Sequence, residues 1–123
     1  MATILVVDDN DPMRQLMHRM LVGAGHDVTL CADGKEAIRL LEIGRVPDLV
    51  VTDLIMPEQE GMETIMIIHE RFPAVKIIAM SGAPGYLASA VALGAHETLA
   101  KPFSASTLDA AIAAALAHEY VGS

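Results

Sequence analysis

The sequence predicts one α/β domain, built on a parallel sheet with helices on both faces. Five short β-rich runs alternate with five longer segments of helical period along the chain. Three of the runs, residues 4–7, 49–51 and 75–80, are nearly continuous apolar stretches, as expected of parallel strands covered on both faces. The length of 123 residues is in the usual range for a single domain. Strict alternation of strand and helix further implies right-handed crossovers.

The expected elements follow from these periodicities. Strands are predicted at residues 3–7, 27–31, 48–52, 75–80 and 97–100. Helices are predicted at residues 12–22, 34–43, 61–71, 84–93 and 104–119. The fourth helix is expected to be short or displaced, because glycines and a proline weaken a helix in that stretch.

Apolar stripes on the first and last helices are predicted to pack on the sheet. The stripe of the first helix consists of Met13, Leu16, Met17, Met20 and Leu21, and that of the last consists of Leu108, Ile112, Ala115 and Leu116. Pro12 suits the first turn of the first helix, and Gly23 suits its end. Asp9 or Asp11 is expected to cap this helix, since aspartate is a favoured N-cap residue.

Composition excludes several classes of function. With 8 basic and 16 acidic residues the formal net charge is −8, which opposes binding to the phosphate backbone of nucleic acid. No apolar run approaches the ~18 residues of a membrane span, so a soluble, cytoplasmic protein is expected. Cys31 is the only cysteine and is expected to be buried and inert, and the five histidines show no metal-ligand spacing.

Acidic residues follow two of the predicted strands directly. Asp8 and Asp9 come after the first strand, and Asp53 comes after the third. Ligands of open parallel sheets bind at the carboxyl ends of the strands, so these three carboxylates are expected to converge if the two strands are neighbours. Crowded like charges cost folding free energy unless a cation compensates them, and Mg²⁺ prefers oxygen ligands. A magnesium site is therefore predicted at this edge.

A hydroxyl and an ammonium group complete the predicted site. Ser81 follows the fourth strand, and Lys101 follows the fifth. Transfer of a phosphoryl group to a carboxylate relies on a metal and on fixed donors that neutralise the phosphoryl oxygens. Asp53, Mg²⁺, Ser81 and Lys101 would supply these parts.

Taken together, the motifs resemble the receiver domain of bacterial two-component response regulators, of the single-domain type found in chemotaxis. They are Asp8-Asp9, the run Asp53-Leu54-Ile55-Met56-Pro57, Gly61, Ser81-Gly82 and Lys101-Pro102-Phe103. The resemblance covers the whole chain. It implies a flavodoxin-like, doubly wound sheet of five strands in the order 2-1-3-4-5 with five helices.

The resemblance also implies a role for each residue of the site. Asp53 resembles the phospho-acceptor, Asp9 a direct Mg²⁺ ligand, and Asp8 a ligand that acts through water. The main-chain carbonyl of Ile55 resembles a further metal ligand. Lys101 resembles the residue that pairs with the acceptor or the phosphoryl group, and Ser81 the switch hydroxyl. The Lys101–Pro102 peptide bond is expected to be cis, and Gly61 to permit a sharp turn.

The implied function is phosphorelay signalling. A histidine kinase or a histidine phosphotransfer protein would supply the phosphoryl group, and the domain would catalyse only its own phosphorylation and dephosphorylation. We expect residues 1–123 to form a single receiver domain without an output domain, as a monomer or weak dimer. Signalling would then pass through protein contact or onward phosphotransfer, with the fourth helix, fifth strand and fifth helix as the contact surface.

Three positions depart from the family pattern. Thr98 occupies the place where many receivers carry an aromatic switch residue, so Tyr86 or Phe103 is considered as a substitute. Ile55 and Ala83 flank the path of the attacking water in relatives, and neither side chain orients a water. Slow self-dephosphorylation is therefore expected.

Two alternatives remain open at this stage. The first is a phosphohydrolase that forms an aspartyl-phosphate at Asp9, since Asp9-Asn10-Asp11 fits an Asp-x-Asp pattern. It lacks late acidic metal ligands other than Asp109 and Glu119. The second is an adaptor that keeps the fold but works without phosphorylation.

Overall fold

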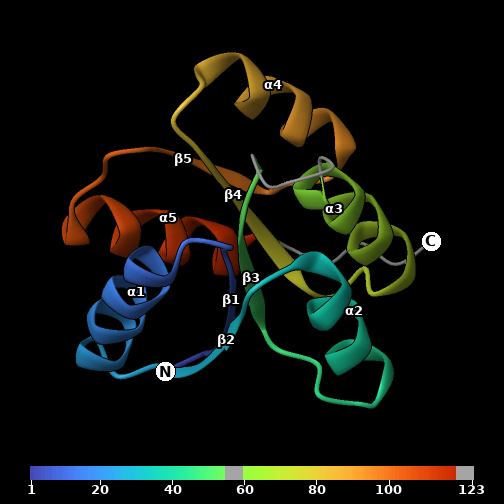
Figure 1. The fold of residues 1–123 in the computed structure, drawn as a ribbon, viewed down its shortest axis with the longest axis horizontal. Helices are drawn as coiled ribbons and strands as arrows, with labels where there is room; N and C mark the ends of the chain where they lie inside the picture. The colour runs from blue at the N-terminus through green and yellow to red at the C-terminus, as the bar shows by residue number, and fades with distance from the viewer. Residues whose placement is uncertain (55–59, 119–123) are drawn as a thin grey trace.

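The computed structural model describes residues 1–54 and 60–118. Strands and helices alternate strictly along them (Figure 1). The strands are β1 (Thr3–Val7), β2 (Asp27–Cys31), β3 (Leu49–Asp53), β4 (Lys76–Ser81) and β5 (Glu97–Ala100). The helices are α1 (Asp11–Gly23), α2 (Gly34–Glu42), α3 (Glu60–Arg71), α4 (Pro84–Leu93) and α5 (Ala105–Ala117). The predicted alternation is confirmed.

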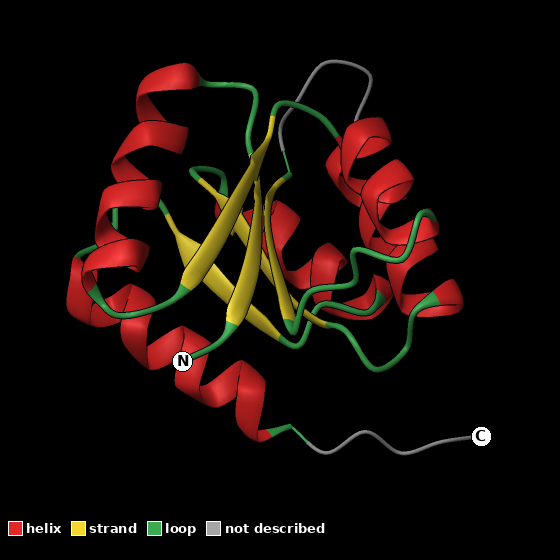
Figure 2. Cartoon of the chain, turned by 90° about the horizontal axis from the view of Figure 1, so that it is seen from below, coloured by secondary structure: helices red, strands yellow, loops and turns green. Residues whose placement is uncertain are grey.

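All five strands lie in one parallel sheet in the order β2-β1-β3-β4-β5. Helices cover both faces of this sheet (Figure 2). The predicted flavodoxin-like topology is therefore confirmed. Because β1 and β3 are neighbours in the sheet, the residues that follow their carboxyl ends are brought side by side.

Two hydrophobic cores hold the helices on the sheet. Alternate residues of β3 enter opposite cores, since Leu49 and Val51 pack with α1 and α5 while Val50 packs with α2, α3 and α4. The largest fully buried side chains include Ile4, Met17, Leu21, Ile65, Ile77, Ile78 and Leu108. Full burial of each aliphatic side chain contributes about 1.5–3 kcal/mol. The cores thus fix the edge of the sheet at which the acidic residues emerge.

The cap of α1 differs from the prediction. Asn10, and not Asp9 or Asp11, is the N-cap residue, and its side chain accepts a hydrogen bond from the Met13 N–H at 2.9 Å. The helix begins at Asp11, one residue earlier than expected, which moves the capping position back to Asn10. Both neighbouring aspartates are thereby released from a capping role.

Two residues of the predicted apolar stripes are not buried. Leu16 is 43% exposed and Leu116 is 39% exposed, whereas their neighbours Met17 and Ala115 are fully buried. Successive residues of a helix are roughly 100° apart around its axis, so each leucine is turned away from the sheet by its buried neighbour. The other stripe positions are buried or half-buried, as predicted.

Helix α4 forms over the predicted residues and is ten residues long, although no side chain caps its first turn. Cys31 is buried, and burial is the main cause that raises the pKa of its thiol to about 12. Across the two described ranges, we find no helix with the length and apolar character to cross a membrane.

Candidate functional site

The predicted site residues meet at the carboxyl edge of the sheet. Asp8 follows β1, Asp53 ends β3, Ser81 ends β4, and Lys101 follows β5. The parallel pairing of neighbouring strands brings these four positions to one side of the molecule. Of the two remaining predicted residues, Asp9 is next to Asp8 in the chain, and Ile55 lies outside the described residues.

Three carboxylates form the centre of this edge. Asp8, Asp9 and Asp53 each offer one oxygen, and these oxygens lie within 4.8 Å of one another. Asp8 is fully buried and Asp53 is 7% exposed, whereas Asp9 faces solvent. The donor set therefore consists of hard oxygen ligands that are open on one side, which fits a cation such as Mg²⁺.

Lys101 bridges two of the three acids. Its Nζ lies 3.3 Å from Oδ2 of Asp8 and 3.3 Å from Oδ2 of Asp53. A single ammonium group cannot neutralise three carboxylates, so negative charge is left in a poorly solvated place. Such an arrangement is costly for folding unless further positive charge is supplied. The lysine accordingly connects the end of β5 to the ends of β1 and β3.

Ser81 lies at the same edge but its hydroxyl belongs to the following turn. Its Oγ accepts a hydrogen bond from the Ala83 N–H at 2.9 Å and lies 3.3 Å from the Ala83 carbonyl oxygen. The residue is 1% exposed. The structure therefore brings Ser81 to the site as predicted, with its hydroxyl engaged in the β4–α4 turn.

Gly61 allows the start of α3 to lie against the main chain at the end of β3. A Cβ atom at this residue would lie 2.2 Å from the carbonyl oxygen of Asp53 and 2.7 Å from the Cα of Leu54. The predicted reason for the glycine was a sharp turn, but its φ lies outside the left-handed region. The structure supports close approach of two backbones as the requirement for glycine at this position.

The residues considered for switching lie on β5, on α4 and after Lys101–Pro102. The Lys101–Pro102 peptide bond is cis, as expected. Thr98 is half-buried in β5, Tyr86 is 50% exposed on α4, and Phe103 is half-buried against the core beneath α1 and α5. Position 98 therefore carries a half-buried threonine in place of an aromatic side chain.

Arg14 is a site residue that the sequence did not identify. Its guanidinium donates from Nη1 to the main-chain carbonyl oxygen of Asp8 at 2.6 Å, and its Nη2 pairs with the carboxylate of Asp11. The side chain is only 15% exposed. The one available signal was the spacing of Asp11 and Arg14, which places an acid and a base on neighbouring turns of a helix.

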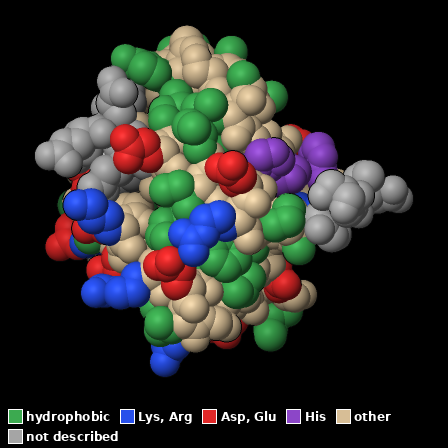
Figure 3. Space-filling model, turned by 90° about the vertical axis from the view of Figure 1, so that its right-hand side faces the viewer, with side chains coloured by type: hydrophobic (Ala, Val, Ile, Leu, Met, Phe, Trp, Pro, Cys, Tyr) green, Lys and Arg blue, Asp and Glu red, His purple; other side chains and the backbone are tan. Residues whose placement is uncertain are grey.

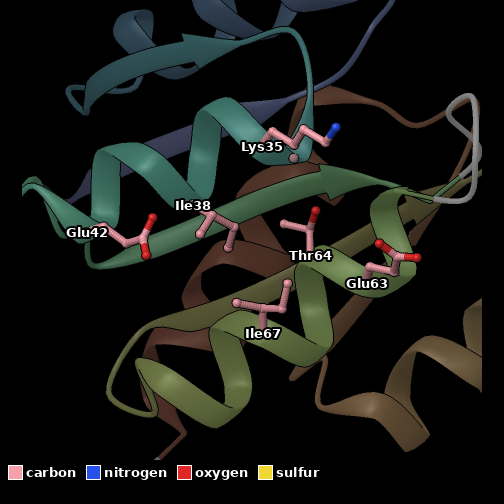
Figure 4. Close-up of a pocket in the computed structure, with 7 residues that line it drawn as sticks. Lys35, Ile38, Glu42, Glu63, Thr64 and Ile67 are labelled. Carbon is pink, nitrogen blue, oxygen red and sulfur yellow. The ribbon is translucent and has the colours of Figure 1, made fainter.

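A groove between α2 and α3 lies apart from the acidic residues. Its volume is about 350 Å³, and it is lined by Gly34, Lys35, Ile38, Glu42, Glu63, Thr64 and Ile67 (Figure 4). Ile38 and Ile67 face each other across it, while charged side chains stand at its ends. It includes none of the predicted site residues.

A second feature outside the site is a group of histidines on one side of the molecule (Figure 3). The rings of His96 and His118 are 5.3 Å apart in an edge-to-face arrangement. Nε2 of His118 lies 2.8 Å from Oε2 of Glu97. These side chains lie at the amino end of β5, opposite the carboxylates.

Comparison with known proteins agrees with this geometry. The family model for the response regulator receiver domain matches residues 4–113. The chain belongs to this family. The receiver domain is 33% identical over 118 residues to the DNA-binding transcriptional regulator NtrC of Rhizobium meliloti, covering 94% of this chain and 24% of that protein. It thus spans about a quarter of the length of NtrC relatives, including the 32% identical protein of Escherichia coli, of which it covers 25%.

Solved receiver structures share the fold closely. A receiver domain protein from Clostridium thermocellum superimposes with a TM-score of 0.86 at 30% identity, over 94% of both chains. The chemotaxis response regulator CheY4 of Vibrio cholerae has a TM-score of 0.82 at 30% identity, over 92% of this receiver domain and 97% of that chain. The similarity therefore extends over the whole described fold.

Proposed function

We propose that this receiver domain accepts a phosphoryl group on Asp53 from a histidine kinase or a histidine phosphotransfer protein. The observation that carries the proposal is the convergence of Asp8, Asp9 and Asp53 within 4.8 Å, with Lys101 bridging two of them. A carboxylate nucleophile among metal-ligating acids and a fixed ammonium group is suited to phosphoryl transfer.

Magnesium fits the donor set. Asp8, Asp9 and Asp53 supply the carboxylate oxygens, and the main-chain carbonyl of Ile55, outside the described residues, is proposed as a further ligand. When bound, the ion supplies charge neutralisation for the oxygens of the transferred group. The cluster is thereby relieved of the repulsion that Lys101 alone leaves in place.

Phosphoryl transfer then depends on the side chains of Asp53, Lys101 and Ser81. One oxygen of Asp53 forms a bond to phosphorus as the phosphorus–nitrogen bond of the donor phosphohistidine breaks, and the histidine nitrogen keeps the electron pair. Lys101 holds the acceptor carboxylate from the side and opposes its charge. The Ser81 hydroxyl leaves its turn by rotation about χ1 and donates to a phosphoryl oxygen. The domain in this role is a signalling element that modifies itself.

The signal is proposed to leave through protein contact or onward phosphotransfer. Ser81 ends β4 shortly before α4, and Lys101 lies between β5 and α5, so both residues adjoin the surface of α4, β5 and α5. The formal net charge of −8 opposes a direct contact with nucleic acid by this domain.

The rival phosphohydrolase reading of Asp9-Asn10-Asp11 is less well supported. The Asp11 carboxylate is exposed and pairs with Arg14, and the group of converging oxygens comes from Asp8, Asp9 and Asp53 instead. An Asp-x-Asp enzyme needs both of its acids at the reacting centre. The geometry therefore favours Asp53 over Asp9 as the nucleophile.

The test is intact-mass analysis after treatment with acetyl phosphate and Mg²⁺. The parent is expected to gain one phosphoryl group, and Asp53→Asn none. Asp48→Asn, the same change at the other end of β3, is the matched control and is expected to be labelled like the parent. Labelling of Asp53→Asn, or repeated turnover of the phosphate donor without a labelled protein, would contradict the proposal. Retention of every partner interaction by Asp53→Asn would support the adaptor instead.

A further inference from the structure

Arg14 is a nearly buried cation beside a site that is itself proposed to bind a cation. The side chain starts in the first turns of α1 and reaches back over the loop between β1 and α1. Nη1 donates to the main-chain carbonyl oxygen of Asp8 at 2.6 Å, and Nη2 contacts the carboxylate of Asp11. A positive charge at this place opposes the binding of a metal ion, so its presence requires a reason other than charge.

The reason lies in the peptide groups on either side of Asp9. The carbonyl of Asp8 and the N–H of Asp9 belong to one planar peptide group, which Arg14 holds through the carbonyl oxygen. The next peptide group ends in the N–H of Asn10, which donates to Oδ1 of Asp8 at 2.9 Å. With both planes held, the two backbone dihedral angles of Asp9 are fixed.

This restraint matters because Asp9 is otherwise weakly held. Its side chain is exposed, and across residues 1–54 and 60–118 we find no hydrogen bond or ion pair that positions its carboxylate. Asp8 and Asp53, by contrast, are buried and contact Lys101. The direction of the Asp9 carboxylate therefore depends on the backbone beneath it.

We propose that Arg14 is a positioning residue for metal binding, which orients the Asp9 carboxylate through the Asp8–Asp9 peptide group. This inference rests on the proposed magnesium site. An arginine suits the task because its planar guanidinium can donate to the Asp8 carbonyl and the Asp11 carboxylate at once. A lysine keeps the charge, but its ammonium group is a compact charge on a flexible stem and lacks the planar fork with which Arg14 holds the two acceptors from separate nitrogens.

An effect of charge and an effect of positioning predict opposite changes in the Mg²⁺ affinity of Arg14→Met. The proposal can therefore be tested. If Arg14 acted only through its charge, Arg14→Met would bind Mg²⁺ more tightly and Arg14→Lys would bind it like the parent. If it positions Asp9, both variants bind Mg²⁺ more weakly. Loss of a group that orients a metal ligand typically reduces metal affinity by about 10-fold or more.

The experiment is isothermal titration calorimetry of Mg²⁺ into the parent, Arg14→Met, Arg14→Lys and Arg19→Met. Arg19 is an exposed arginine of the same helix and provides the matched control for removal of one positive charge. We expect about 10-fold weaker binding for both Arg14 variants and a change below about twofold for Arg19→Met. Because affinity is measured on folded protein, a loss of stability alone does not produce this pattern.

The remaining outcomes separate the two proposals. If the parent binds no Mg²⁺, the proposed magnesium site is wrong, and the role of Arg14 falls with it. If the parent binds Mg²⁺ and Arg14→Lys binds it equally well or more tightly, the site stands and the positioning role is wrong. If Arg14→Met does not fold, as judged by thermal denaturation, Arg14→Lys decides alone.

Discussion

Strand β3 has an aspartate at each end, and the two residues meet different surroundings. Asp48 precedes the strand, and its Oδ2 accepts a hydrogen bond from the Thr3 N–H at 2.9 Å. Asp53 ends the strand and shares its edge with two more carboxylates and one lysine. The same side chain is thus a hydrogen-bond acceptor for the main chain at the amino edge and one of three clustered carboxylates at the carboxyl edge.

The arrangement of Asp48 is repeated along the amino edge of the sheet. Nδ1 of His26 accepts from the Ala2 N–H at 3.1 Å, and Nδ1 of His96 accepts from the Ile77 N–H at 3.0 Å. In each case a side chain before one strand satisfies a backbone N–H at the beginning of its neighbour. Unpaired backbone groups are costly when buried, so this edge is closed by internal hydrogen bonds. The carboxyl edge is left for ligands.

The largest effect on stability is expected from Gly61→Ala, which drives the start of α3 away from β3. The added methyl group would lie 2.2 Å from the Asp53 carbonyl oxygen, so backbone must move. We expect a loss of about 3 kcal/mol in the free energy of unfolding, measured by urea denaturation. Gly85→Ala is the matched control, because Gly85 is also the second residue of its helix and a Cβ there meets no atom within 4 Å. Equal stability of the two variants would show that the close approach is not restrictive.

Magnesium should stabilise the carboxyl edge. A ligand that binds only the folded state adds about 2.7 kcal/mol at a concentration 100 times its dissociation constant. Thermal denaturation of the parent with and without Mg²⁺ is expected to show this gain, and chelation with EDTA to reverse it. Asp53→Asn removes the negative charge of one of the three proposed carboxylate ligands and should retain only a small part of the gain. A full gain in that variant would place the ion somewhere else.

The fold and the carboxyl edge were predictable from sequence because both depend on order along the chain. Apolar runs such as residues 49–51 identify buried strands, and Asp8, Asp53, Ser81 and Lys101 each adjoin the end of a strand. Parallel pairing then brings them together whatever the details of packing. Leu16 was misjudged because a count of apolar positions does not show how wide a stripe the sheet covers.

The sequence did not reveal the hydrogen bonds that Arg14, His26 and His96 make with main-chain groups. Arg14 holds the carbonyl of Asp8, a main-chain atom that no residue type reveals. His26 and His96 accept from backbone N–H groups that are 24 and 19 residues away, which only the strand register brings into range. Scattered histidines at these positions gave no pattern in the sequence, so the closed amino edge emerges only from the structure.

His96, at the amino edge of the sheet, is expected to make a pH-dependent contribution to the free energy of unfolding. Burial is the main cause that lowers the pKa of His96 from its ordinary value of 6.5, with Lys76, His118 and His69 acting in the same direction and Glu97 opposing them. Since the folded-state pKa lies below the unfolded one, His96 contributes stability above about pH 6.5, and this is lost as the pH falls through the folded value. Protonation also removes the acceptor of the Ile77 N–H, worth about 1 kcal/mol.

The comparison that isolates this contribution is between the parent and His96→Asn. An asparagine Oδ1 can take the place of Nδ1 as acceptor and does not titrate in this range. Urea denaturation of both proteins between about pH 8 and pH 5 should show the parent losing more stability than the variant. Parallel curves would mean that protonation of His96 is not coupled to folding, whatever the constant difference between them.

The smallest effect is expected from Asp48→Asn, and it tests the contrast between the two ends of β3 directly. The amide oxygen of asparagine can still accept from the Thr3 N–H, and the residue is exposed, so little is lost by removing its charge. We expect a change within about 0.5 kcal/mol in urea denaturation, and no change in Mg²⁺ affinity. A larger loss would show that the amino edge also depends on charge. A change in Mg²⁺ affinity would show that the two edges are coupled through β3, because Asp48 reaches the carboxylates only through the strand.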